Sequence, residues 1–238
     1  MGPHNTPVPV VAIVVAAGSG SRLGAEVPKA LVEVAGVPLL ARAVAQLAAG
    51  GVHEVVVVAP VTGREAFVEA LASAPIPVLW ADGGAERQDS VGNGLALLPV
   101  LPEADADAQV VLVHDAARAF VPADVVARVV AAVRAGADAV VPVVPVSDSI
   151  RQLVAEGSSV VDRAMLRAVQ TPQGFRRGVI EQAHAALAES GLAVTDDAAA
   201  AEFIGSHVVL VEGSPDAFKV TGPLDLVLAE AIVARGLS

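Results

Sequence analysis

The sequence has no cysteine and no tyrosine, and only two of its 238 residues are lysine. Without cysteine there can be no disulfide bridge and no thiolate metal site, so a chain of this length must rely on its hydrophobic core. Long apolar runs are missing too. Although 54% of the residues are hydrophobic, no stretch approaches the roughly 20 apolar residues that span a bilayer. We therefore expect no membrane partner.

Positive charge is scarce. The formal net charge is −11 at pH 7, which argues against nucleic acid as a partner, because non-specific binding of nucleic acid needs a positive surface. An anionic ligand would have to occupy a local cationic pocket. Of the 15 lysine and arginine residues, only Lys29 and Lys219 are lysine. A lysine side chain offers a compact, movable ammonium group, whereas arginine offers a planar guanidinium. On the count alone, chance accounts for the two lysines equally well.

The first residues carry neither the basic region nor the separate apolar core of a secretory signal, because residues 8–17 already have the pattern of a strand. A cytoplasmic location is therefore expected. The histidines outside the predicted loops have no partners at metal-ligand spacing and are expected to be surface or packing residues; they are His4, His53, His184 and His207.

Apolar, β-branched runs alternate with helical segments along most of the chain. Strands are expected at 10–17, 54–59, 77–80, 110–113, 139–144, 207–211 and, in a shorter form, 218–220. Helices are expected at 38–49, 63–72, from the turn at 82–89 to 98, and at 122–135, 177–190, 195–204 and 224–235. This alternation predicts one α/β domain over residues 1–238, with a mostly parallel sheet flanked by helices and right-handed crossovers.

Polar loops follow three of these strands directly, at residues 18–29, 82–90 and 114–118. Ligands of such folds bind at the carboxyl ends of the parallel strands, so the three loops are predicted to share one rim. Residues 146–169 break the alternation, because two short alternating segments flank the turn at 155–158. We expect an inserted β-hairpin arm that packs on the body or, as we favour, on a partner chain.

The first loop, Gly18-Ser-Gly20-Ser-Arg22-Leu-Gly24, ends a strand and precedes Lys29. Glycines let backbone N–H groups approach an anion, and the Arg and Lys add full charges. The spacing is one residue longer than the dinucleotide fingerprint and lacks the Gly-Lys-Ser/Thr of a Walker loop. The glycines alone suit a structural turn equally well, whereas the two cations favour a phosphate site.

Seven motifs, in this order, resemble the 2-C-methyl-D-erythritol 4-phosphate cytidylyltransferase family over about residues 10–235. They are residues 16–24 with Pro28-Lys29, then 82–90, 113–118, 161–163, 171–173, 194–197 and 218–221. The resemblance implies a Rossmann-like fold of the nucleotide-diphospho-sugar transferase type. It also implies transfer of CMP from CTP to 2-C-methyl-D-erythritol 4-phosphate with release of pyrophosphate, and Mg²⁺ as the cofactor.

The resemblance also implies roles for individual residues. Arg22 and Lys29 match cations at the triphosphate, and Asp115 matches the Mg²⁺ ligand. The implied nucleotide-binding set is Ala16, Ala17, Gly18, Gly20, Gly84, Ala85, Arg87, Ser90 and Ala116. Ala85 stands where the family often has Asp, which weakens base discrimination if that carboxylate accepts from the cytosine amino group. Without the resemblance, Asp115 could equally be a carboxylate in a turn. Residues 82–90 could equally be the capped start of a helix.

For the acceptor, the resemblance implies catalytic roles for Arg163 and Lys219. It implies substrate contacts at Arg118, Ser149, Thr195, Asp196 and Thr221. The arm of the family reaches across a homodimer, so Ser149, which replaces the usual Thr, and Arg163 would serve the neighbouring subunit. Arg163 could instead form an interface salt bridge.

Other functions stay open at this stage. A cytidylyltransferase acting on ribitol phosphate or another polyol phosphate would share the loop chemistry. A regulatory protein that binds nucleotide without turnover is less well supported, because binding alone does not demand Arg22, Lys29 and Lys219 around one phosphorus. A dinucleotide-dependent oxidoreductase is disfavoured because no acidic residue closes the second strand.

Overall fold

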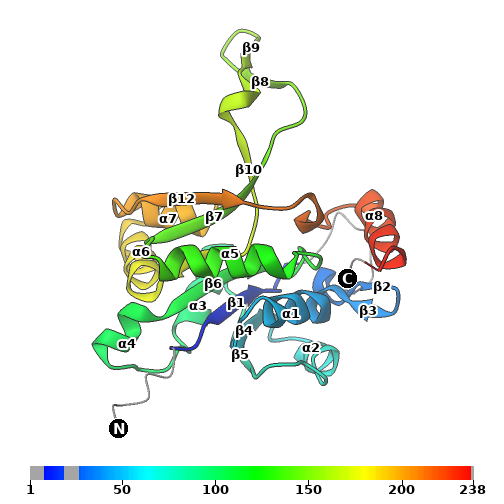
Figure 1. Ribbon diagram of the computed structural model, residues 1–238, viewed down its shortest axis with the longest axis vertical. Helices are drawn as coiled ribbons and strands as arrows, with labels where there is room; N and C mark the ends of the chain where they lie inside the picture. The colour runs from blue at the N-terminus through cyan, green and yellow to red at the C-terminus, as the bar shows by residue number, and fades with distance from the viewer. Residues whose placement is uncertain (1–7, 19–26, 237–238) are drawn as a thin grey trace.

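The computed structural model describes residues 8–18 and 27–236, and an eight-stranded sheet forms its centre (Figure 1). The strand order is β10-β7-β11-β6-β1-β4-β5, and β12 also pairs with β7. The strands are β1 (Val11–Val15), β4 (Glu54–Ala59), β5 (Val78–Asp82), β6 (Val110–Asp115), β7 (Ala139–Pro145), β10 (Arg167–Val169), β11 (Gln173–Arg176) and β12 (Val208–Glu212).

The sheet is mainly parallel, as predicted. β1 runs parallel to β4 and β6, β4 to β5, and β7 to β12. The exceptions are β10 and β11, which run antiparallel to their neighbours. The sequence does not indicate β11, because Gln-Gly-Phe-Arg has no apolar run. Its strand geometry comes from backbone pairing with β6 and β7, which only the assembled sheet supplies.

Both faces of the sheet are buried, which explains the unbroken apolar runs. Ala12 and Val14 of β1 belong to one hydrophobic cluster and Val11 and Ile13 to another. The first cluster includes side chains of α1 (Leu39–Ala49), α2 (Arg64–Ala70) and α5 (Ala123–Arg134). The second includes side chains of α3 (Arg87–Leu95), α6 (Arg177–Ser190) and α7 (Asp197–Phe203). Helices therefore cover both faces, as predicted.

The predicted helices are all present, with ends that differ by a few residues. α6 has the predicted bounds, whereas α3 ends at Leu95 and not near 98. The last helix is α8 (Pro223–Ala234). Several short elements were not predicted: η2 (Lys29–Leu31), β2 (Glu33–Val34), β3 (Val37–Pro38), α4 (Glu103–Ala108), η3 (Arg163–Met165) and η4 (Pro215–Ala217).

The short strand expected at 218–220 is wrong. These residues form no strand, although Val220 N donates to Ala117 O at 2.9 Å. The segment passes beyond the carboxyl end of β6, where it cannot join a ladder, and its apolar residues serve packing. Phe218 stacks on Phe120 with ring centroids 6.1 Å apart, and Val220 is fully buried.

The inserted segment 146–169 contains the predicted hairpin. β8 (Ile150–Leu153) pairs antiparallel with β9 (Ser158–Val161), and the chain returns through η3 to β10. Figure 1 shows this arm projecting away from the sheet and its helices. Apolar side chains on it are exposed, including Leu153 and Met165 at 84% and 82%. Among the described residues, no helix is long and apolar enough to cross a membrane.

Candidate functional site

A cavity of about 360 Å³ lies at the carboxyl ends of β1 and β6. Four segments line it: the loop after β1 with the start of η2, the loop that opens α3, the loop after β6, and the chain just before α8. The lining residues are Val15, Ala16, Ala17, Gly18, Lys29, Ala30, Gly84, Ala85, Glu86, Arg87, Ser90, Asp115, Ala116, Ala117, Lys219 and Thr221. The prediction that the three polar loops share one rim is therefore confirmed.

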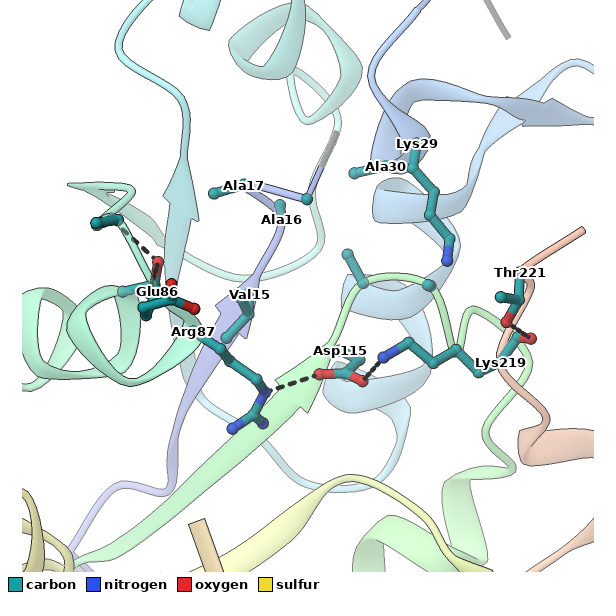
Figure 2. A pocket seen from close by; sticks show the side chains of 16 residues that line it. Val15, Ala16, Ala17, Lys29, Ala30, Glu86, Arg87, Asp115, Lys219 and Thr221 are labelled. Atoms are coloured by element: carbon teal, nitrogen blue, oxygen red, sulfur yellow. Dashed lines mark hydrogen bonds and ion pairs between the residues drawn. The ribbon is translucent and has the colours of Figure 1, made fainter. Parts of the chain in front are cut away.

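Lys29 reaches this cavity from the first position of η2, and Figure 2 shows its amino group on the same side as Lys219. The two lysines that the composition singled out therefore line one pocket, although one comes early in the chain and the other late. Gly20 and Arg22 lie outside the described residues, so their roles stay predictions.

The loop that opens α3 is held by its own side chains. Ser90 Oγ accepts from Gly84 N at 3.0 Å and donates to Glu86 O at 3.1 Å. Glu86 N donates to Asp89 Oδ2 at 3.0 Å. A Cβ on Gly84 would lie 2.2 Å from Asp89 Cβ, so only glycine fits there. Ser90, predicted as a nucleotide contact, lines the pocket and also fixes the shape of its wall.

Asp115 ends β6 at the floor of the pocket, between two cations (Figure 2). Its Oδ2 lies 2.7 Å from Lys219 Nζ, and its Oδ1 lies 3.5 Å from Arg87 Nε. Burial alone would raise the pKa of the Asp115 carboxyl. The attraction of Arg87 and Lys219 outweighs burial and lowers that pKa to about 2. The pocket therefore holds an ionised carboxylate flanked by positive charge.

The Thr171 hydroxyl holds the backbone of Asp115 in place. Thr171 Oγ1 accepts from Asp115 N at 3.1 Å and lies 3.0 Å from His114 Nδ1. His114 is fully buried, and burial lowers its pKa from 6.5 to about 4. His114 is therefore a neutral packing partner near pH 7, and it has no exposed atom with which to contact a ligand.

A second ion pair lies behind Arg87 and was not predicted. Arg87 Nη1 lies 2.6 Å from Asp197 Oδ2, and Asp197 Oδ1 lies 3.0 Å from His184 Nε2. His184, which was expected to be a surface or packing residue, is buried and is also hydrogen-bonded to Asp197. Asp197 belongs to the motif at 194–197, at the start of the helix expected over 195–204. The contact joins α3 to α7 across 110 positions, and no local pattern reports such a distance.

Thr221 and Arg118 secure the segment that carries Lys219. Thr221 Oγ1 donates to Lys219 O at 2.8 Å and lines the pocket. Arg118 donates to Ala217 O at 2.8 Å and to Val169 O at 3.1 Å. Arg118 does not line the cavity, and its guanidinium ties the base of the arm to η4. Its predicted contact with the acceptor stays a prediction.

The remaining predicted residues also lie outside the cavity lining. Ser149 and Arg163 belong to the arm, where Arg163 Nη1 donates to Ser147 O. Thr195 is exposed, whereas Asp196 caps α7 by accepting from Ala199 N at 2.9 Å and also accepts from Gln173 Nε2 at 2.9 Å. The structure thus gives Asp196 a local role, and the substrate contacts of all four residues stay predictions.

Comparisons with known proteins agree over almost the whole chain. The family model described as 2-C-methyl-D-erythritol 4-phosphate cytidylyltransferase matches residues 10–235. A protein of that name from Saccharopolyspora erythraea is 53% identical over 229 residues, covering 94% of this chain and 99% of the relative. Another from Rhodococcus opacus is 48% identical over 232 residues, covering 96% of each. A crystal structure of the Thermus thermophilus protein of that name is 37% identical, with a TM-score of 0.76, covering 94% of this chain and 99% of that one.

Proposed function

Because this chain belongs to the 2-C-methyl-D-erythritol 4-phosphate cytidylyltransferase family, we propose that it transfers the cytidylyl group of CTP to 2-C-methyl-D-erythritol 4-phosphate and releases pyrophosphate. The observation that carries this proposal is the grouping of Lys29, Lys219 and Arg87 around one cavity of a chain whose net charge is −11. Such a grouping suits a ligand with several negative charges.

The chemistry of the reaction fits these residues. A phosphate oxygen of the acceptor attacks the α-phosphorus of CTP, and the bond to pyrophosphate breaks. This step needs in-line placement and neutralisation of charge more than proton transfer. Lys29 and Lys219 enter the cavity from the same side, where their ammonium groups would neutralise the charge that grows on the phosphate oxygens.

Mg²⁺ is proposed as the cofactor, with Asp115 as its protein ligand. The carboxylate is ionised, lines the cavity and has a side chain that is 13% exposed. Within residues 8–18 and 27–236, no group of three or more His, Cys, Asp or Glu residues could hold a metal ion. One carboxylate suits Mg²⁺, which keeps several waters and binds substrate phosphates. When bound, the ion would neutralise phosphate charge; Asp115 would orient it, and Lys219 would hold Asp115 in place.

A homodimer joined through the arm is also proposed. Ser149 and Arg163 lie on the arm and do not line the cavity of their own chain. The exposed apolar side chains Leu153, Val160 and Met165 lie on the same arm, and a partner surface would bury them. We further propose that the enzyme works in the cytoplasm, as the sequence pattern suggested.

An acceptor screen tests the proposed function. The protein is incubated with CTP and Mg²⁺ together with 2-C-methyl-D-erythritol 4-phosphate or ribitol phosphate, and pyrophosphate release is measured. We expect release with the first acceptor and little with the second. Equal rates would favour the broader polyol-phosphate activity, and no release with either would refute the proposal.

A further inference from the structure

We propose that Asp197 is a positioning residue, which holds the Arg87 guanidinium at the wall of the cavity and keeps it from closing onto Asp115. This inference rests on the proposed function. It is carried by the two ion pairs of Arg87, one to Asp197 at 2.6 Å and one to Asp115 at 3.5 Å.

Asp197 is a buried acidic residue in the first turn of α7. Its side chain is 2% exposed, and burying a carboxylate is costly unless it is paired. It is the first residue of α7, yet the cap of that helix is the neighbouring Asp196. The position therefore serves contacts other than the helix cap, namely those to Arg87 and His184.

His184 fixes Asp197 from the opposite side. His184 Nε2 lies 3.0 Å from Asp197 Oδ1, whereas Arg87 uses Oδ2, so each carboxylate oxygen has one partner. His184 is itself buried in α6. The carboxylate is thus held by two packed helices, and it presents one oxygen to Arg87 in a single direction.

The distances show what this arrangement prevents. Arg87 Nε is 3.5 Å from Asp115 Oδ1, which is beyond the usual length of an N–H···O hydrogen bond. Without Asp197, the Arg87 guanidinium would be drawn into a closer bidentate pair with Asp115. Such a pair would occupy Asp115 Oδ1 and compete with Lys219 for Oδ2, so that both oxygens of the carboxylate that we propose as the Mg²⁺ ligand would be held by cations of the protein.

The rival explanation is that the Arg87–Asp197 pair only fastens α3 to α7. Both explanations predict a loss of stability when the pair is broken, so stability does not separate them. They differ in the kinetics. If Asp197 acts through Arg87, its replacement changes the handling of CTP only while Arg87 is present, whereas a structural role persists without Arg87.

The test is a double-mutant cycle on the full chain. KM and kcat for CTP and for the acceptor are measured in wild type, Asp197→Asn, Arg87→Met and the double variant. We expect Asp197→Asn to raise the KM for CTP by about tenfold, the lower end of the loss seen when the partner of a metal ligand is removed, and to leave the KM for the acceptor unchanged. In the Arg87→Met background, the same replacement should have no further effect.

Two further variants serve as controls for the double-mutant cycle. Ala200→Gly loosens the buried contact between α7 and α6 without touching Arg87, and it should lower the melting temperature but not change the KM for CTP. His184→Leu leaves both ions of the pair in place and should raise that KM by a smaller factor than Asp197→Asn. If Asp197→Asn does not fold, His184→Leu replaces it in the test.

The outcomes separate the two proposals. An equal rise in the KM for CTP in both Arg87 backgrounds, or no rise with either Asp197→Asn or His184→Leu, would overturn the positioning role. A wild-type protein with no turnover would refute the proposed function instead. Calorimetric titration of the same variants with CTP would then decide the positioning role through the dissociation constant.

Discussion

Lys219 Nζ lies 2.7 Å from Asp115 Oδ2, although the two residues are 104 positions apart. The pair joins the end of β6 to the segment before α8, and Arg87 approaches Asp115 from the other side. The contact makes the lysine part of the electrostatic environment of the carboxylate. It also predicts how the carboxylate will respond when the lysine is removed.

Replacing Lys219 by Met should raise the pKa of Asp115 from about 2 toward its ordinary value, because Lys219 is one of the two cations that lower it. The pKa can be followed by carbon-detected NMR of the Asp carboxyl groups between pH 2 and 6, with Asp115→Asn to assign the signal. An unchanged pKa in Lys219→Met would show that Arg87 alone sets the ionisation of Asp115.

Lys29→Ala should reduce kcat by about 10²-fold or more, because it removes a charge that contacts the transition state. Its melting temperature should stay close to that of wild type. Arg134→Ala is the matched control, since it removes an exposed cation at the far end of α5 and changes the net charge equally. A near-normal rate for Lys29→Ala would remove Lys29 from the mechanism.

A glycine before α3 and one inside it should respond differently to alanine. A Cβ on Gly84 would meet Asp89 Cβ at 2.2 Å and Ser90 N at 3.0 Å, whereas nothing lies within 4 Å of a Cβ on Gly92. Gly84→Ala should therefore destabilise the protein by about 1–3 kcal/mol and raise the KM for CTP. Gly92→Ala should stabilise it by roughly 0.5–1 kcal/mol, because glycine inside a helix is unfavourable. Denaturant unfolding and steady-state kinetics measure both effects, and a normal KM in Gly84→Ala would contradict the role of this loop.

Mixing inactive Lys29→Ala and Arg163→Ala chains should restore about a quarter of the wild-type activity, since half of the dimers would be mixed and each would contain one complete site. The control mixture is Lys29→Ala with Lys219→Ala. Both residues line the cavity of one chain, so no mixed dimer would regain a complete site. Recovery in neither mixture, with subunit exchange verified, would mean that Arg163 does not serve the neighbouring site.

The buried His114 should make stability depend on pH. Burial lowers its pKa from 6.5 to about 4, so between these values the unfolded chain binds a proton that the folded chain does not. The contribution of neutral His114 to the free energy of unfolding is therefore complete above about pH 6.5, and it falls by up to about 3 kcal/mol as the pH drops to 4. Urea unfolding of wild type and His114→Asn across this range measures the difference. Parallel curves for the two proteins would show that His114 does not carry the effect.

Much of the site could be predicted from the sequence because its parts lie at the ends of recognisable strands. The apolar runs that became β1, β5 and β6 locate three loops on one rim, since parallel strands all deliver their carboxyl ends to the same edge. Lys29 and Asp115 lie in these loops, whereas Lys219 was assigned by resemblance alone, and all three line the cavity.

By itself, the sequence determined the alternating fold, the family and the loops that meet at the rim, because period, β-branching and motif order are local properties of the chain. Only the tertiary structure decided that β11 enters the sheet, that residues 218–220 do not, and that Asp197 and His184 stand behind Arg87. The physical reason is the same in each case. A polar strand, an apolar segment outside the sheet and a buried ion pair depend on partners 13 to 110 positions away, and the neighbouring residues do not encode which partner each will contact.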